Sequence, residues 1–207
     1  NADELHDLRS VSKSIVGLIY ADRYVVGLIL GLTLTGIYSF YWSLANALQT
    51  LVATAVVQTA LPILVRSYRE GSRDGWYRVM KREMIKTALL TPALAIGIMI
   101  GSEVLIYMMG MSNLSEHRLL FSLMLAAAVI RCCSDLLNVG LISAQADKLY
   151  VYYNIAGVFI SLGLMALGSY LWGLDGAGIA SLITAVLLLA MRVYGLRHWI
   201  RKDKLLS

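Results

Sequence analysis

The strongest constraint in this sequence is a succession of long segments that carry almost no charge. Six such segments can be read along the 207 residues, at about 14–34, 37–64, 87–111, 119–143, 150–172 and 177–196. Each is close to or longer than the ~20 residues that a helix needs to cross the ~30 Å apolar core of a bilayer. Six in succession, joined by short polar pieces, indicate an integral membrane protein. Because lipid offers the backbone no hydrogen-bond partner, we expect every span to be a helix.

Composition agrees, since 58% of the residues are hydrophobic and 15% are charged, against roughly 25% charged residues in a soluble domain. We therefore predict an all-α fold, a polytopic bundle of six transmembrane helices over 14–198. Residues 1–13 are predicted as a cytoplasmic entry segment and 199–207 as a cytoplasmic tail. Because Asn1 is not a start methionine and no secretory signal precedes the first span, we expect a fragment that lacks earlier helices.

Lysine and arginine gather in alternate connections. The basic set is centred on a predicted loop at 66–86 and also flanks the first span, separates spans four and five, and follows span six. The other connections, 33–36, 112–118 and 172–178, contribute one base, Arg118. This bias places loop 66–86 and both chain ends in the cytoplasm. The alternation with apolar spans explains the net charge of +5 better than a nucleic-acid partner does.

Aromatic residues also occur in the basic loop, where Trp76 and Tyr77 lie between arginines. One interpretation is an interfacial helix that rests on anionic headgroups. The other is a topology signal and nothing more.

A polar stripe runs along the second span. At 100° per residue its members fall within an arc of about 80°: Ser39, Ser43, Asn46, Thr50 and Thr54, with Gln49 nearby and Gln58 just beyond. Apolar residues occupy the opposite side: Leu44, Leu48, Leu51 and Val52. The stripe either packs against other helices through hydrogen bonds or lines a water-filled cavity. In the second case the serines and threonines line the cavity, and the three amides Asn46, Gln49 and Gln58 bind substrate.

The fourth span carries charge near its middle. Arg131, Asp135 and Asn138 share one helix face, and the first two are four residues apart, so they can meet across one turn. A charge at mid-bilayer costs at least ~2.5 kcal/mol, which is more than an exposed ion pair returns. The pair either fixes the register of helices or belongs to a polar site inside the bundle, in which Asn138 would also bind substrate.

A second acid and base lie in the first span, in "IYADRYVVGLILG". Asp22 and Arg23 are successive and point about 100° apart, so each needs a partner on another helix or in water. Arg23 and Arg131 are candidates for holding an anionic group such as a phosphate, which suits the planar guanidinium. Asp22 and Asp135 are candidates for ion or proton coupling, or for balancing the charge of those arginines.

Signs of enzymatic chemistry are absent from the sequence. It contains no Gly-rich phosphate loop, no G-x-S-x-G and no H-E-x-x-H, and His6, His117 and His198 lie apart near span ends. Cys132 and Cys133 are adjacent, which suits neither a framework disulfide nor a metal site. We predict no catalytic residue, no metal and no cofactor.

Two stretches resemble a known family. "YADRYVVGLILGLTLTGIYSFYWSLANALQTLVATAVVQTALPILVRSYREG" (20–71) has an Asp-Arg inside a helix, a glycine-rich stretch, "GIYS" at the turn and P-x-L-x-R-x-Y-x-x-G at its end. It resembles the seventh and eighth helices of bacterial polysaccharide flippases, which export the lipid carriers of O-antigen and capsule. "GLDGAGIASLITAVLLLAMRVY" (173–194) is similar to the last helix of that family.

The resemblance implies the C-terminal half of a two-lobed transporter of about twelve helices, in the multidrug/oligosaccharidyl-lipid/polysaccharide exporter superfamily. It implies alternating access in a bacterial inner membrane, with a polyprenyl-pyrophosphate-linked oligosaccharide as substrate. Membrane lipids, a polysaccharide polymerase and chain-length proteins are the other partners that it implies. The alternatives are a multidrug exporter of the same superfamily, a membrane polysaccharide polymerase or ligase, and a non-transporting scaffold.

Overall fold

The computed structural model describes residues 21–69, 73–110, 114 and 116–204. The described residues form helices and short connections, with no strand among them. The elements are α2 (Ala21–Leu30), α3 (Leu32–Val52), the π-helical turn η1 (Ala53–Val57), α4 (Gln58–Arg69), α5 (Arg73–Met109), α7 (Arg118–Ser143) and α8 (Asp147–Lys204). The predicted all-helical class is confirmed for this part of the chain. The predicted entry segment 1–13 and residues 14–20 of the first span lie outside it.

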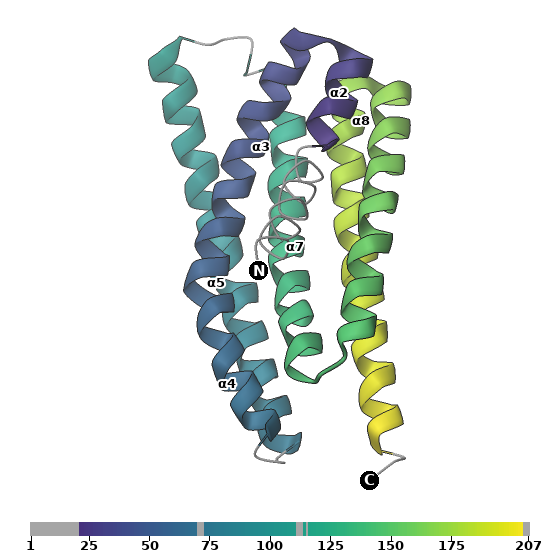
Figure 1. Cartoon of the computed structure of the whole chain (residues 1–207). Helices are drawn as coiled ribbons and strands as arrows, with labels where there is room; N and C mark the ends of the chain where they lie inside the picture. Colours follow the sequence, from purple (N-terminus) through teal and green to yellow (C-terminus); the bar gives the residue numbers. More distant parts are fainter. Residues whose placement is uncertain (1–20, 70–72, 111–113, 115, 205–207) are drawn as a thin grey trace, which may run out of the picture.

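Two ends of the bundle collect the connections (Figure 1). The end of α4, the start of α5, the α7–α8 connection and the end of α8 lie at one end, and the α2–α3 connection, the end of α5 and the start of α7 lie at the other. The long element α8 changes direction at Trp172 (φ −129°, ψ 17°) and Gly173 (φ 60°, ψ −136°). Its two segments run side by side (Figure 1), with Gly168 against Gly176 near the bend. The second segment therefore returns to the end that carries the α7–α8 connection.

Four helical stretches are long and apolar enough to cross a membrane: Leu32–Arg69, Asp74–Met108, Arg118–Ser143 and Lys148–Trp199. They contain the apolar segments predicted from 37–64 onwards, except for residues 109–111 of the segment 87–111. The last two of those segments lie on either side of the bend in α8. The described fold is therefore compatible with a membrane protein. Half of the apolar window of α7 is buried, the largest share of the four. This agrees with its central place among the helices in Figure 1.

The connections differ from the prediction in two places. The chain turns at Gly31, not at 33–36, and α3 begins at Leu32. Gly31 has φ 84°, a conformation that glycine adopts without steric cost. The basic segment predicted as a loop at 66–86 is helical over its described residues, because α4 continues to Arg69 and α5 begins at Arg73.

Trp76 also departs from the interfacial interpretation. It is 4% exposed, its ring packs edge-on against Tyr68, and its Nε1–H donates to Ser143 Oγ at 3.0 Å. An indole with its N–H satisfied inside the bundle joins helices to one another and does not rest on headgroups. Tyr77, by contrast, is 61% exposed.

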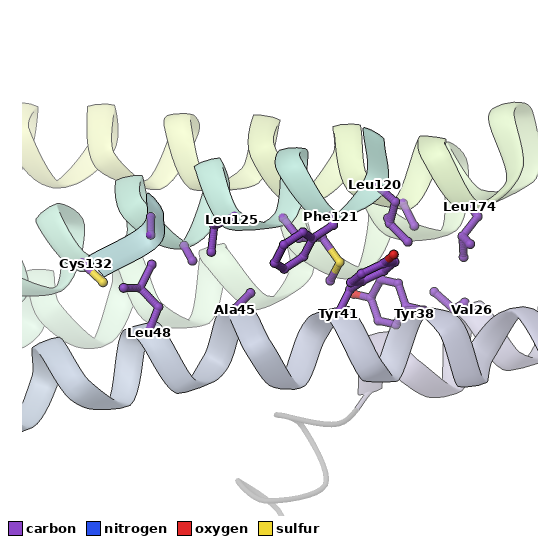
Figure 2. Close-up of a cluster of buried hydrophobic side chains, with 14 of the residues drawn as sticks. Val26, Tyr38, Tyr41, Ala45, Leu48, Leu120, Phe121, Leu125, Cys132 and Leu174 are labelled. Atoms are coloured by element: carbon purple, nitrogen blue, oxygen red, sulfur yellow. The ribbon is translucent and has the colours of Figure 1, made fainter. Parts of the chain in front are cut away.

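One core cluster holds α2, α3, α7 and α8 together (Figure 2). The buried residues of α3 recur at spacings of three and four along one face: Tyr38, Tyr41, Ala45, Leu48 and Val52. This spacing puts them on a single stripe of a 3.6-residue helix. Figure 2 shows Phe121 and Leu125 of α7 facing that stripe, and the rings of Tyr41 and Phe121 stack at a centroid distance of 4.8 Å.

Candidate functional site

A polar cavity lies among the helices that carry the predicted charges. Its volume is about 300 Å³. Asp22 of α2 lines it, as do residues of α3 (Trp42, Ala45, Asn46 and Gln49), of α7 (Met124 and Arg131) and of both segments of α8 (Asn154, Gly157, Val158, Ser161, Leu162, Ser181, Thr184, Leu188 and Arg192). Four of the predicted site residues therefore meet here: Asp22, Asn46, Gln49 and Arg131. They come from three helices, so only the tertiary fold brings them together.

Arg131 is half-buried in the wall of this cavity. Its Nη2 donates to the Oγ of Ser181 at 3.0 Å, and Ser181 is 4% exposed. A guanidinium carries five N–H donors, and this is the one hydrogen bond that Arg131 donates within the described part of the chain. Its remaining donors leave it able to bind a ligand oxygen in the cavity.

The contact between Arg131 and Asp135 that their spacing allows is not formed. Asp135 pairs instead with Arg192 of α8, whose Nη1 lies 3.0 Å from Asp135 Oδ1. The i,i+4 spacing permits contact between two side chains but does not require it. Here α8 supplies a better partner to each residue, Ser181 to Arg131 and Arg192 to Asp135.

Arg192 is the site residue that the sequence reasoning missed. It is 5% exposed; its Nη1 also donates to Ser134 Oγ at 2.8 Å, and its Nη2 donates to Asn154 Oδ1 at 2.9 Å. Its buried Nε has no hydrogen-bond partner within the described part of the chain. The sequence contained a sign of its importance, because Arg192 lies inside the predicted span 177–196, where a charged side chain is costly.

Asn138 joins the same network without lining the cavity. Its Nδ2 donates to Asn154 Oδ1 at 3.2 Å, and Asn154 Nδ2 donates to the carbonyl of Tyr150 at 2.8 Å. Asn154 Oδ1 therefore accepts from both Asn138 and Arg192. Asn138 contacts Asn154, which lines the cavity, but does not line the cavity itself. Its position therefore does not support the direct substrate contact predicted for it.

Asp22 and Arg23 have separate partners on α3, as their successive positions predicted. Asp22 Oδ2 accepts a hydrogen bond from Tyr38 Oη at 3.2 Å, and Oδ1 accepts one from the backbone N–H of Arg23 at 3.0 Å. The guanidinium carbon of Arg23 lies 4.0 Å from the centre of the Trp42 ring, within cation–π range. Trp42 lines the cavity and Arg23 does not, so Arg23 lies beside the candidate site and not in its wall.

The polar stripe of α3 divides between two environments. Asn46 and Gln49 face the cavity, whereas Ser43, Thr50 and Thr54 are exposed. Each of these three hydroxyls donates to the carbonyl four residues earlier in its own helix, at 2.7 to 2.9 Å. Their hydroxyl protons are therefore satisfied without contact with another helix.

The remaining members of the stripe also lie outside the cavity. Ser39 is half-buried and Gln58 is exposed at the start of α4. On the side predicted to be apolar, Leu48 is buried as expected, but Leu51 is 53% exposed. Leu51 lies at the flank of the stripe, so the exposed face is wider than the polar stripe alone.

The side chains of the cavity can bind a ligand by hydrogen bonds and by charge. The cavity offers the charged donors of Arg131 and Arg192, the amides of Asn46, Gln49 and Asn154, and the carboxylate of Asp22. Such a set can hold an anion together with hydroxyl-rich groups. Among the residues that the structure describes, no group of three or more His, Cys, Asp or Glu side chains is placed to hold a metal ion.

Comparisons with known proteins give no relative from which a role could be transferred. No protein family, no curated protein and no solved structure matches this chain.

Proposed function

We propose that this chain is part of a membrane transporter that flips a polyprenyl-pyrophosphate-linked oligosaccharide from the cytoplasmic to the outer leaflet of a bacterial inner membrane. The observation that carries the proposal is the cavity among long apolar helices, where Arg131 faces amides from α3 and α8. Burying such groups costs free energy in any membrane protein. A transporter that must bind an anionic, sugar-bearing lipid has a use for them.

In this proposal the substrate's two chemical parts contact different side chains. The pyrophosphate binds the guanidinium of Arg131, whose planar donors suit phosphate oxygens. Sugar hydroxyls bind the amides of Asn46 and Gln49, which both donate and accept hydrogen bonds. Asp22 balances the charge of Arg131 between transport cycles or binds the coupling ion.

The orientation and the second lobe are further parts of the proposal. Lysine and arginine gather at the bundle end that holds the end of α4, the start of α5, the α7–α8 connection and the end of α8, which we assign to the cytoplasm. The two segments of α8 count as two spans, and α2 belongs to the predicted first span 14–34, which makes six. The exposed stripe of α3 would face a second six-helix lobe across a central hydrated space, as in alternating-access transporters built from two halves.

The experiment compares arginine variants in cells whose surface polysaccharide depends on the full-length protein. Arg131→Ala should reduce surface polysaccharide about thirtyfold or more, since removing a guanidinium that binds a phosphate group costs ~2 kcal/mol or more. Arg131→Lys should be intermediate because an ammonium lacks the bidentate geometry. Membrane levels of both variants, measured by immunoblot, should equal that of the wild type.

Arg118→Ala is the matched control. Arg118 lies on the same helix, but it is exposed and pairs with Glu103 at 2.8 Å near the α5–α7 connection. Its loss should leave export unchanged. Normal export by Arg131→Ala at normal membrane level would exclude a role of Arg131 in substrate binding.

A multidrug exporter is the second candidate, because the cavity also contains an acid and an aromatic ring, Asp22 and Trp42. Those two groups could hold an organic cation. Protection of cells against cationic dyes, lost in Asp22→Asn and kept in Arg131→Ala, would favour this candidate over the flippase.

A further inference from the structure

A second cavity of about 300 Å³ lies between α5, α7 and the C-terminal segment of α8. Its lining includes the apolar side chains Met80, Ile85, Leu137 and Leu196, together with two cations, Lys81 and Arg197. We call it the basal groove. It shares no lining residue with the polar cavity.

The floor of the basal groove is apolar and closely packed. Met80, Leu137 and Leu196 are each less than 8% exposed, while Ile85 on the wall is 50% exposed. Met80 and Leu196 meet over Gly140, where an added Cβ would lie 3.0 Å from Met80 Cε. The small residue on α7 thus lets the side chains of α5 and α8 form a floor without filling the groove.

The two cations of the groove are exposed, and their charged groups have no partner among the described residues. Within the described ranges, neither Lys81 nor Arg197 donates a hydrogen bond or forms an ion pair. The neighbouring bases on α5, Arg82 and Lys86, do have a partner. Both form ion pairs with Glu83, at 3.0 and 2.9 Å. Two unpaired positive charges beside an apolar floor indicate a ligand that is anionic at one end and apolar at the other.

We propose that the basal groove binds an anionic phospholipid, with its phosphate on Lys81 and Arg197 and one acyl chain along the apolar floor. Lys81 precedes the apolar segment 87–111 and Arg197 follows the segment 177–196. Both cations therefore stand where headgroups are expected, and the floor residue Leu137 lies inside the span 119–143. Basic pockets between membrane helices at the cytoplasmic side suit anionic headgroups. The proposal uses the membrane orientation given above and no part of the transport cycle.

Native mass spectrometry of the purified full chain in detergent tests the site. Dioleoyl phosphatidylglycerol should be retained as one bound lipid, and dioleoyl phosphatidylcholine should be displaced at equal concentration. Lys81→Gln and Arg197→Gln should each weaken phosphatidylglycerol binding about fivefold, and the double variant about thirtyfold. Arg78→Gln is the matched control, because Arg78 is an exposed base of α5 that donates to the carbonyl of Asp74 in its own helix. It should bind like the wild type.

A separate set of measurements tests the acyl-chain contact. Ile85→Trp would fill the groove without changing its charge and should weaken binding, and dihexanoyl phosphatidylglycerol should bind more weakly than the long-chain lipid. Unchanged binding by the double charge variant, equal retention of phosphatidylcholine, or an equal loss in Arg78→Gln would overturn the proposal. Unchanged binding by Ile85→Trp would overturn the acyl-chain contact. Because the readout is lipid retention, it is independent of whether the chain supports export.

Discussion

Arg192 of α8 and Asp135 of α7 form an ion pair whose two partners differ widely in exposure. Nη1 and Oδ1 are 3.0 Å apart, and the Arg192 side chain is 6% exposed while that of Asp135 is 49% exposed. Losing the pair should therefore cost more for the buried guanidinium of Arg192 than for the half-exposed carboxylate of Asp135. Asp135 balances a charge that Ser134 and Asn154 otherwise hold by hydrogen bonds alone.

This asymmetry predicts unequal effects of the two truncations. Asp135→Ala leaves a buried guanidinium without its counter-charge and should cost about 3 kcal/mol of unfolding free energy, the low end of the range for a broken buried pair. Arg192→Met puts an apolar chain of similar length in a buried place and should cost less than half as much. Denaturant unfolding in mixed micelles measures both. Adding Asp135→Ala to Arg192→Met should then leave the free energy of unfolding almost unchanged. A loss as large as that of Asp135→Ala alone would contradict the pairing.

A second prediction concerns Arg131 and Asp135, which have different partners although they stand one turn apart. Their single and double alanine variants should combine additively, with a coupling below ~0.5 kcal/mol in the same unfolding assay. Asp135→Ala should not restore export to Arg131→Ala. Recovery of export in the double variant would mean that these two residues neutralise each other in the working protein.

The sequence predicted the helical spans because hydropathy and length are properties of each segment alone. The partners of charged side chains depend on which helices become neighbours, and local spacing does not carry that information. The spacing of Arg131 and Asp135 allowed a contact within one helix, but their observed partners, Ser181 and Arg192, come from α8. The charge of Arg192 was visible inside an apolar span, but its role became apparent only beside Asp135.

Boundaries were harder to predict for a related reason. Leu30 and Leu32 flank the turn with apolar side chains, so the hydropathy pattern hid the glycine at which the chain reverses. Pro92 lies near the start of the predicted segment 87–111, yet α5 runs through it from Arg73 to Met109. A proline removes one hydrogen bond from a helix, and packing along both of its sides can maintain the helix despite that loss.

A third prediction concerns the close approach of the two α8 segments. A Cβ on Gly168 would collide with the carbonyl oxygen of Gly176, and backbone cannot move aside as a flexible side chain can. Gly168→Ala should therefore separate the segments and lower the level of folded protein severely, measured by fluorescence-detected size exclusion. Gly163 lies in the same segment with nothing within 4 Å of its added Cβ. Gly163→Ala should fold as well as the wild type or gain up to about 1 kcal/mol. Equal tolerance of both variants would contradict the packing of the bend.

The fourth prediction tests whether the exposed stripe of α3 faces water. In the proposed transporter, cysteines at Ser43, Thr50 and Thr54 face the space between two lobes and should react with a membrane-impermeant thiol reagent. Cysteines at Leu48 and Val52, each at most 1% exposed, should stay unlabelled.

The labelling background must lack the native cysteines, Cys132 and Cys133, which are free thiols. Gel-shift labelling in intact membranes then reports each position, with denatured samples as the control for total thiol. A cysteine at Leu51 sharpens the test, because this residue is 53% exposed at the flank of the stripe. Labelling at the stripe but not at position 51 would define a narrow hydrated path, and labelling at both would define a wide one. If the stripe stays inert while denatured samples label fully, lipid or another helix covers it, and its serines and threonines do not line a transport cavity.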